Sequence, residues 1–148
     1  MKVSFGADIL VYATDPRSDD KRPRALDLMR RAMYAGSGIL LLQTLVDVCE
    51  RARQELIPVW KVKPIIEAWR AVLPVQTPDE EDFVAAIETW TAHRSFSDAL
   101  LWASAKRAGV THILTEDASD GMDIYGVVSV NPFARKNDQL VDRILPDL

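Results

Sequence analysis

The chain has 148 residues, of which 48% are hydrophobic, and this is the length and composition of one globular domain with a well-covered core. Its formal net charge of −4 argues against a protein whose main task is to coat nucleic acid, because such proteins carry a basic surplus. We therefore expect a single domain over residues 1–148 that has local rather than general basic patches.

The cysteine and the N-terminal segment indicate a cytoplasmic location. Cys49 is the only cysteine, so no internal disulfide can form, and its surroundings favour a buried structural thiol in a reducing compartment. Asp8 interrupts what would have to be the apolar stretch of a signal peptide, and no run reaches the roughly 20 apolar residues of a membrane span. His93 and His112 have no metal-ligand spacing to another histidine or cysteine, so we assign them no role.

Short apolar runs alternate with helical patterns along the chain. The runs at 3–5, 38–42, 113–115 and 127–130 show little alternation, as expected of strands buried on both faces. Helical spacing of apolar residues predicts helices around 25–32 and 62–73, and a further helix from about 97 to 106. This alternation predicts an α/β fold with a mostly parallel central sheet flanked by helices.

One more helix has a clear start signal. Thr77 is the expected N-cap, with proline next and Glu80 three residues on, and this helix should turn Phe83, Ala86, Ile87 and Trp90 inward. The other three tryptophans also fit core positions on helices: Trp60, Trp69 and Trp102.

Acidic residues recur where a parallel sheet gathers its ligands. Asp8 follows the first strand, Asp47 lies in the first turns of the helix after the second, Asp98 opens the helix at 97–106, and Glu116 and Asp117 close the strand at 113–115. Ligands of such sheets bind outside the carboxyl ends of the strands, so four chain segments should deliver carboxylates to one edge.

Carboxylates gathered in this way need a counter-ion, because two unit charges at 4 Å repel by about 4 kcal/mol at an effective dielectric of 20. Oxygen ligands without histidine or cysteine indicate Mg²⁺ or Mn²⁺, which would supply the chemistry for phosphodiester hydrolysis.

A simpler interpretation remains open for three of these residues. The segments 44–47 and 95–98 both match the [ST]-x-x-[DE] capping pattern, so Asp47 and Asp98 could only stabilise helix N-termini. Asp117 and Asp120 could be ordinary turn residues before Gly121.

With these residues in view, the chain resembles the PIN-domain family, and within it the VapC-type toxins of bacterial toxin-antitoxin pairs. The stretch 96–121, FSDALLWASAKRAGVTHILTEDASDG, resembles the family's third and fourth acidic motifs, with Asp98 and Asp117 at the acidic positions. QTLVDV at 43–48 resembles the second motif, where Asp47 stands in place of the usual glutamate. FGADILVYA resembles the opening motif, and Asn131-Pro132-Phe133 the closing segment.

The opening motif departs from the family pattern at its acidic position. A gapless alignment puts the first acidic residue on Gly6, which has no side chain to bind a metal, and puts Asp8 where asparagine is common. Either Asp8 reaches in from two residues further along, or the site lacks one ligand.

The resemblance implies a PIN-like three-layer sandwich and a Mg²⁺- or Mn²⁺-dependent endoribonuclease. It implies metal-binding, catalytic roles for Asp47, Asp98 and Asp117, with Asp8 as a fourth, and it implies an RNA substrate, a small antitoxin partner and a homodimer. Two alternatives stay open: a catalytically impaired PIN-like binding module, which follows from Gly6, and a receiver-like phosphoacceptor domain, which lacks the lysine it would need at 127–133.

Overall fold

The computed structural model describes residues 1–90 and 95–148, and His93 lies outside these ranges. Its strands are β1 (Lys2–Phe5), β2 (Leu40–Leu41), β3 (Val75–Gln76), β4 (Val110–Leu114), β5 (Asp123–Ile124) and β6 (Val127–Val130). Its helices are α1 (Ala7–Thr14), α2 (Arg22–Ala35), α3 (Leu42–Gln54), α4 (Val59–Val72), α5 (Glu80–Thr89), α6 (Phe96–Arg107) and α7 (Asp138–Ile144), with a 3₁₀ turn at Arg135–Asn137.

The strands form a mostly parallel sheet. One part has the order β1-β4-β6-β5, in which β5 alone is antiparallel, and the other part pairs β2 with β3. A parallel bridge between Val3 and Gly38 joins the two parts, so the order across the sheet is β3-β2-β1-β4-β6-β5. A Cβ on Gly38 would lie 2.7 Å from Leu73, so glycine permits this close approach.

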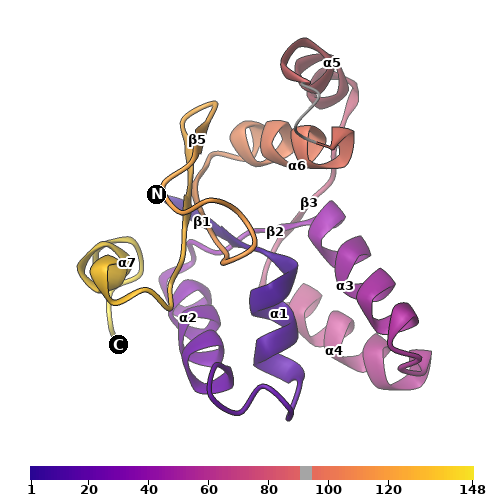
Figure 1. Ribbon diagram of the computed structural model, residues 1–148, viewed down its shortest axis with the longest axis vertical. Helices are drawn as coiled ribbons and strands as arrows, with labels where there is room; N and C mark the ends of the chain where they lie inside the picture. The colour runs from indigo at the N-terminus through magenta and orange to yellow at the C-terminus, as the bar shows by residue number, and fades with distance from the viewer. Residues whose placement is uncertain (91–94) are drawn as a thin grey trace.

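Helices cover both faces of the sheet, which confirms the predicted three-layer α/β architecture. Figure 1 shows α5 and α6 at the top of the view and α1 to α4 below, with the strands between them. One core cluster joins α1, α2 and α7 to the sheet through buried residues such as Phe5, Leu10, Leu28 and Val141. A second cluster packs Trp102 of α6 against the other face.

Local signals set several helix ends. Gly36, at φ 64°, ends α2 in the left-handed conformation that glycine adopts without strain. The helix predicted to begin after Thr77 begins later, because Asp79 and Asp82 form a reciprocal capping box. The strand predicted at 38–42 is shorter, because α3 begins at Leu42.

Some predicted core residues are exposed. Phe83, Ile87 and Trp90 are each about half exposed, because α5 packs chiefly against α6 and only Ala86 of the predicted inward face is buried. Trp60 is 68% exposed, whereas Trp69 and Trp102 are buried as predicted. The prediction of a buried thiol is wrong, since Cys49 is exposed.

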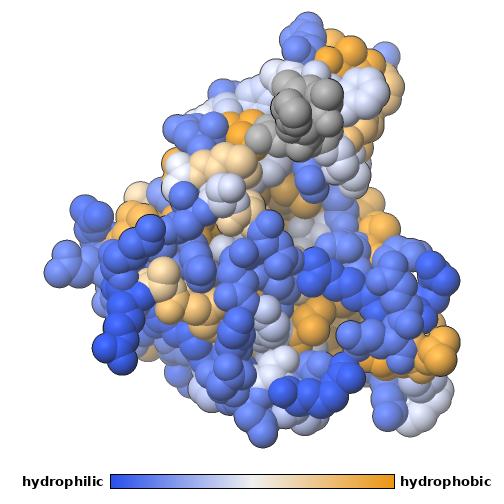
Figure 2. Space-filling model, in the orientation of Figure 1, coloured by the Kyte–Doolittle hydropathy of each residue, from blue (hydrophilic) through white to orange (hydrophobic). Residues whose placement is uncertain are grey.

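The face of the molecule drawn in Figure 2 is mostly hydrophilic, with separate apolar areas. Figure 2 shows apolar atoms at the top of the view, over α5, and at the lower right, near the α3–α4 turn. In the parts of the chain that the structure describes, no helix combines the length and the apolar character needed to cross a membrane.

Candidate active site

The carboxyl ends of β1 and β4 lie side by side, because these strands are parallel neighbours that pair Phe5 with Leu114. The chain after β1 turns directly into α1, and the chain after β4 forms the loop 115–117. Asp8, in the first turn of α1, therefore meets the loop that carries Asp117. The two segments are more than 100 residues apart in the sequence.

Asp8 is buried, with 1% of its surface exposed, and it is held by the loop after β4. Thr115 Oγ1 donates to Asp8 Oδ1 at 3.0 Å, and the backbone N–H of Glu116 donates to Asp8 Oδ2 at 2.8 Å. Burial raises the pKa of Asp8 above its usual value, and the charge of Asp117 acts in the same direction, while the hydrogen bonds oppose the shift. This aspartate is therefore a fixed carboxyl group with an elevated proton affinity.

Asp8 occupies the space next to Gly6. A Cβ at residue 6 would lie 2.5 Å from Asp8 Oδ1 and 2.6 Å from Thr115 Oγ1. Gly6 itself has φ −69° and ψ 162°, an extended conformation open to any residue, so neighbours rather than backbone strain exclude a side chain there. The carboxylate of Asp8 therefore fills the space that a side chain at residue 6 would need.

Glu116 fastens the same loop from its other side. Its carboxylate accepts hydrogen bonds from the Tyr12 hydroxyl and from Lys21 Nζ, which also lies over the Tyr12 ring. Burial disfavours the charged form of Glu116, but the hydrogen bonds from Lys21 and Tyr12 lower its pKa below the usual value. Burial and the neighbouring Glu116 carboxylate raise the pKa of Tyr12 to about 12. Glu116 is thus a structural tie between the loop and α1, not an exposed ligand.

Asp47 and Asp117 both form ion pairs with the same arginine, Arg51. Arg51, one turn beyond Asp47 on α3, lies 2.8 Å from Asp117 Oδ2 and 3.3 Å from Asp47 Oδ2. Partial burial disfavours its charge, but Asp117, Asp47 and Asp8 together raise the pKa of Arg51. We call Asp8, Asp47 and Asp117 the acidic rim, because their charges converge on this guanidinium.

Among the described residues, no hydrogen bond or ion pair joins Asp98 to the acidic rim. Asp98 lies in the first turn of α6, where its backbone N–H donates to Ser95 Oγ at 3.1 Å, so Ser95 is the N-cap. Within residues 1–90 and 95–148, the exposed carboxylate of Asp98 has no hydrogen-bond or ion-pair partner. The capping pattern predicted at 44–47 is absent from α3, whose N-cap is Leu41 without a side-chain bond.

The acidic rim offers the oxygen donors that Mg²⁺ and Mn²⁺ prefer, but its arrangement does not fit a divalent ion while Arg51 is in place. Across the described ranges, no three histidine, cysteine, aspartate or glutamate side chains come together in a way that could hold a metal. Sequence reasoning missed Arg51, although its position four residues after Asp47 on a helix was a usable signal.

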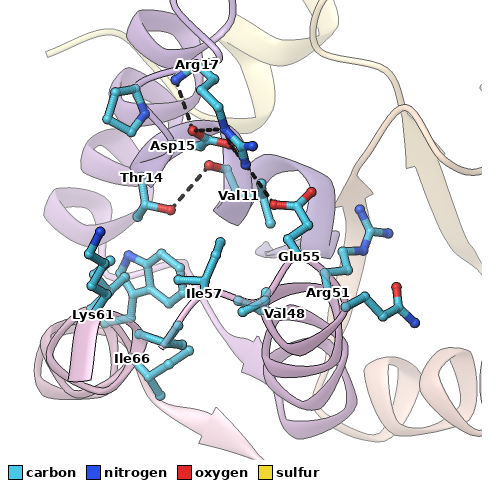
Figure 3. Close-up of a pocket in the computed structure, with 16 residues that line it drawn as sticks. Val11, Thr14, Asp15, Arg17, Val48, Arg51, Glu55, Ile57, Lys61 and Ile66 are labelled. Atoms are coloured by element: carbon cyan, nitrogen blue, oxygen red, sulfur yellow. Dashed lines mark hydrogen bonds and ion pairs between the residues drawn. The ribbon is translucent and has the colours of Figure 1, made fainter. Parts of the chain in front are cut away.

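A groove of about 520 Å³ borders the acidic rim and lies between α1, α3 and α4 (Figure 3). Its apolar lining includes Val11, Val48, Ile57, Ile66 and Trp69. Arg17, which bonds both Asp15 and Glu55, ties the end of α1 to the end of α3 at its edge. Arg51 also lines this groove, so one side chain belongs to both the groove and the rim.

The sheet order and the helices on both faces give the chain a PIN-like fold. The chain is similar to the crystal structure of the Mycobacterium tuberculosis toxin VapC20, which is described as cleaving the sarcin-ricin loop. The match has a TM-score of 0.60 and 13% identity, and covers 80% of this chain and 92% of that one. No protein-family model and no curated protein sequence matches the chain.

Proposed function

We propose that this protein is an endoribonuclease of the VapC toxin kind that hydrolyses RNA phosphodiester bonds with Mg²⁺ or Mn²⁺ as cofactor. The observation that carries the proposal is the convergence of Asp8 and Asp117 at the carboxyl ends of two adjacent parallel strands. The fold is shared with a toxin described as cleaving the sarcin-ricin loop. In open parallel sheets this edge is where ligands bind.

Each candidate residue has a part in the proposal. Asp8, Asp47 and Asp117 are the carboxylates that would hold the ion, with Asp98 of α6 as a further candidate. The ion would supply charge neutralisation at the scissile phosphate and a water of lowered pKa. Thr115 and the Glu116 N–H keep the buried carboxyl of Asp8 in one orientation, which limits the misplacement that costs rate.

The partners proposed are a small antitoxin and a second copy of the chain. The apolar groove between α1, α3 and α4 supports the antitoxin, because a segment seated there would lie against Arg51 and so beside the acidic rim. The exposed apolar residues of α5, Phe83, Val84 and Ile87, support a homodimer contact.

Cleavage of a mixed RNA pool in Mn²⁺ tests the proposed activity. We expect the wild-type protein to cut, and Asp8→Asn and Asp117→Asn to lose about a hundredfold in rate. Asp19→Asn is the matched control, because Asp19 is an exposed aspartate outside the rim. Absence of cutting by the wild-type protein, or equal cutting by all four proteins, would refute the assignment.

One observation favours a second candidate function, a PIN-like binding module that does not cut. Arg51 neutralises two of the three rim carboxylates, and such a rim could hold RNA or the antitoxin without catalysis. RNA retained intact by the wild-type protein in millimolar Mn²⁺, measured by filter binding beside the cleavage assay, is the result this function predicts. Cleaved RNA excludes it.

A further inference from the structure

Arg51 is the central side chain of the acidic rim. Its Nη2 lies 2.8 Å from an oxygen of Asp117 and 3.3 Å from an oxygen of Asp47. The first contact crosses 66 residues of sequence and joins α3 to the loop after β4. The guanidinium thus lies between two carboxylates that are proposed above as ligands of a divalent cation.

The local structure keeps this charge in place. Asp47 and Arg51 are four residues apart on α3, and side chains at that spacing lie on the same helix face. An arginine does not lose its proton at any pH that proteins tolerate, so its charge is permanent. Asp8, buried nearby, adds a third negative charge that favours this arrangement.

A divalent ion at the same carboxylates would meet the fixed positive charge at short range. The side chain of Arg51 is 39% exposed, and its long flexible stem gives it a route into solvent or along the neighbouring groove. Two arrangements are therefore open to the rim, one with the guanidinium between the carboxylates and one with the carboxylates free for another cation.

We infer that Arg51 is a built-in counter-ion that competes with a divalent cation for Asp47 and Asp117, so that the rim takes up metal only when Arg51 swings away. The inference rests on the proposed function for the identity of the competing cation. It adds that metal affinity is set by a side chain of this chain that is not itself a ligand.

Calorimetric titration of the full chain with Mn²⁺ alone, at low ionic strength, tests the competition. Arg51→Met removes the charge but keeps an apolar stem against the groove. Arg53→Met is the matched control, because Arg53 lies on the same helix, is 71% exposed and pairs with Glu50 away from the rim. We expect Arg51→Met to bind Mn²⁺ about tenfold more tightly than the wild-type protein, and Arg53→Met to change the affinity by less than about twofold.

A second variant covers the case in which Arg51→Met perturbs the fold. Arg51→Lys keeps the charge but loses the planar fork, so its Mn²⁺ affinity should stay within a fewfold of the wild-type value. Equal Mn²⁺ affinities for Arg51→Met, Arg53→Met and the wild-type protein would overturn the inference, as would the absence of Mn²⁺ binding by all of them.

The outcome is separable from that of the proposed function, because the titration contains no RNA. Tighter Mn²⁺ binding by Arg51→Met without RNA cleavage would leave the competition standing and refute the nuclease. RNA cleavage by the wild-type protein, together with unchanged Mn²⁺ affinity in Arg51→Met, would support the nuclease and refute the competition.

Discussion

Asp8 fills the space that a side chain at Gly6 would need, since its Oδ1 lies 2.5 Å from the position of a Cβ at residue 6. Thr115 closes the same space from the loop after β4, with Oγ1 at 2.6 Å. A carboxylate added at residue 6 would therefore collide with one already present, instead of filling an empty position.

Gly6→Ala should destabilise the fold by about 1 to 3 kcal/mol, the usual cost of overpacking a filled site. The backbone at Gly6 is extended, so strain in φ does not contribute. Urea unfolding measures the change. In an Asp8→Ala background the cost should fall but not vanish, because Thr115 still blocks the space. A Gly6→Ala protein as stable as the wild type would show that the contact is relieved at no cost.

Asp8→Asn should change how stability depends on pH. Burial raises the pKa of Asp8 in the folded protein. The neutral carboxyl group therefore stabilises the fold fully at pH values below the pKa of Asp8 in the unfolded chain, near 3.8. This stabilisation is lost as the pH rises through the pKa of Asp8 in the folded protein. An uncharged asparagine avoids that loss. In chelator, the melting temperature of Asp8→Asn relative to wild type should be higher at pH 7 than at pH 4. Asp19→Asn, the exposed control, should show no such trend.

Ser95→Ala and Asp98→Asn separate the cap of α6 from a metal-ligand role. Ser95 Oγ accepts from the Asp98 N–H, so Ser95→Ala should cost about 1 kcal/mol. Asp98→Asn keeps that N–H and should change stability by less than about 0.5 kcal/mol. Mn²⁺ affinity measured on the same proteins should fall only for Asp98→Asn if its carboxylate is a ligand. Equal affinities would exclude that role.

Arg31→Met should destabilise the C-terminal segment by about 1.5 to 3 kcal/mol, the range for hydrogen bonds to charged groups. The buried guanidinium of Arg31 pairs with Asp27 and Asp142 and donates to the Leu145 carbonyl, and so fixes α7 to α2. Arg30→Met is the control, since Arg30 is 59% exposed and pairs with the same Asp27 on its own helix. Thermal unfolding should separate the two variants, and equal losses would contradict this account.

The sequence predicted the layers of the fold because buried strands and amphipathic helices leave distinct patterns. The runs at 3–5 and 127–130 lie in β1 and β6, and the predicted helical core residue Trp69 is buried. The prediction failed on α5, where periodicity identifies an apolar stripe but not the surface it meets. Because α5 packs chiefly on α6 and not on the sheet, Phe83 and Ile87 are exposed.

The site was only partly predictable for a related reason. Topology brought Asp8 and Asp117 to one edge, as the sequence indicated. The orientation of Asp8 depends on Thr115, 107 residues away, and no local pattern encodes that contact. The position of Asp117 beside Arg51 likewise depends on how α3 meets the loop after β4.

Hydrogen exchange at the Glu116 amide can be used to follow opening of the acidic rim. The Glu116 N–H donates to the buried Asp8 carboxylate, while the Glu116 side chain is tied to Tyr12 and Lys21. Exchange of this proton with deuterium requires the loop to separate from α1, so its rate measures how often the rim opens. One resonance in a nuclear magnetic resonance spectrum would thus follow the integrity of the site, with or without a bound cation.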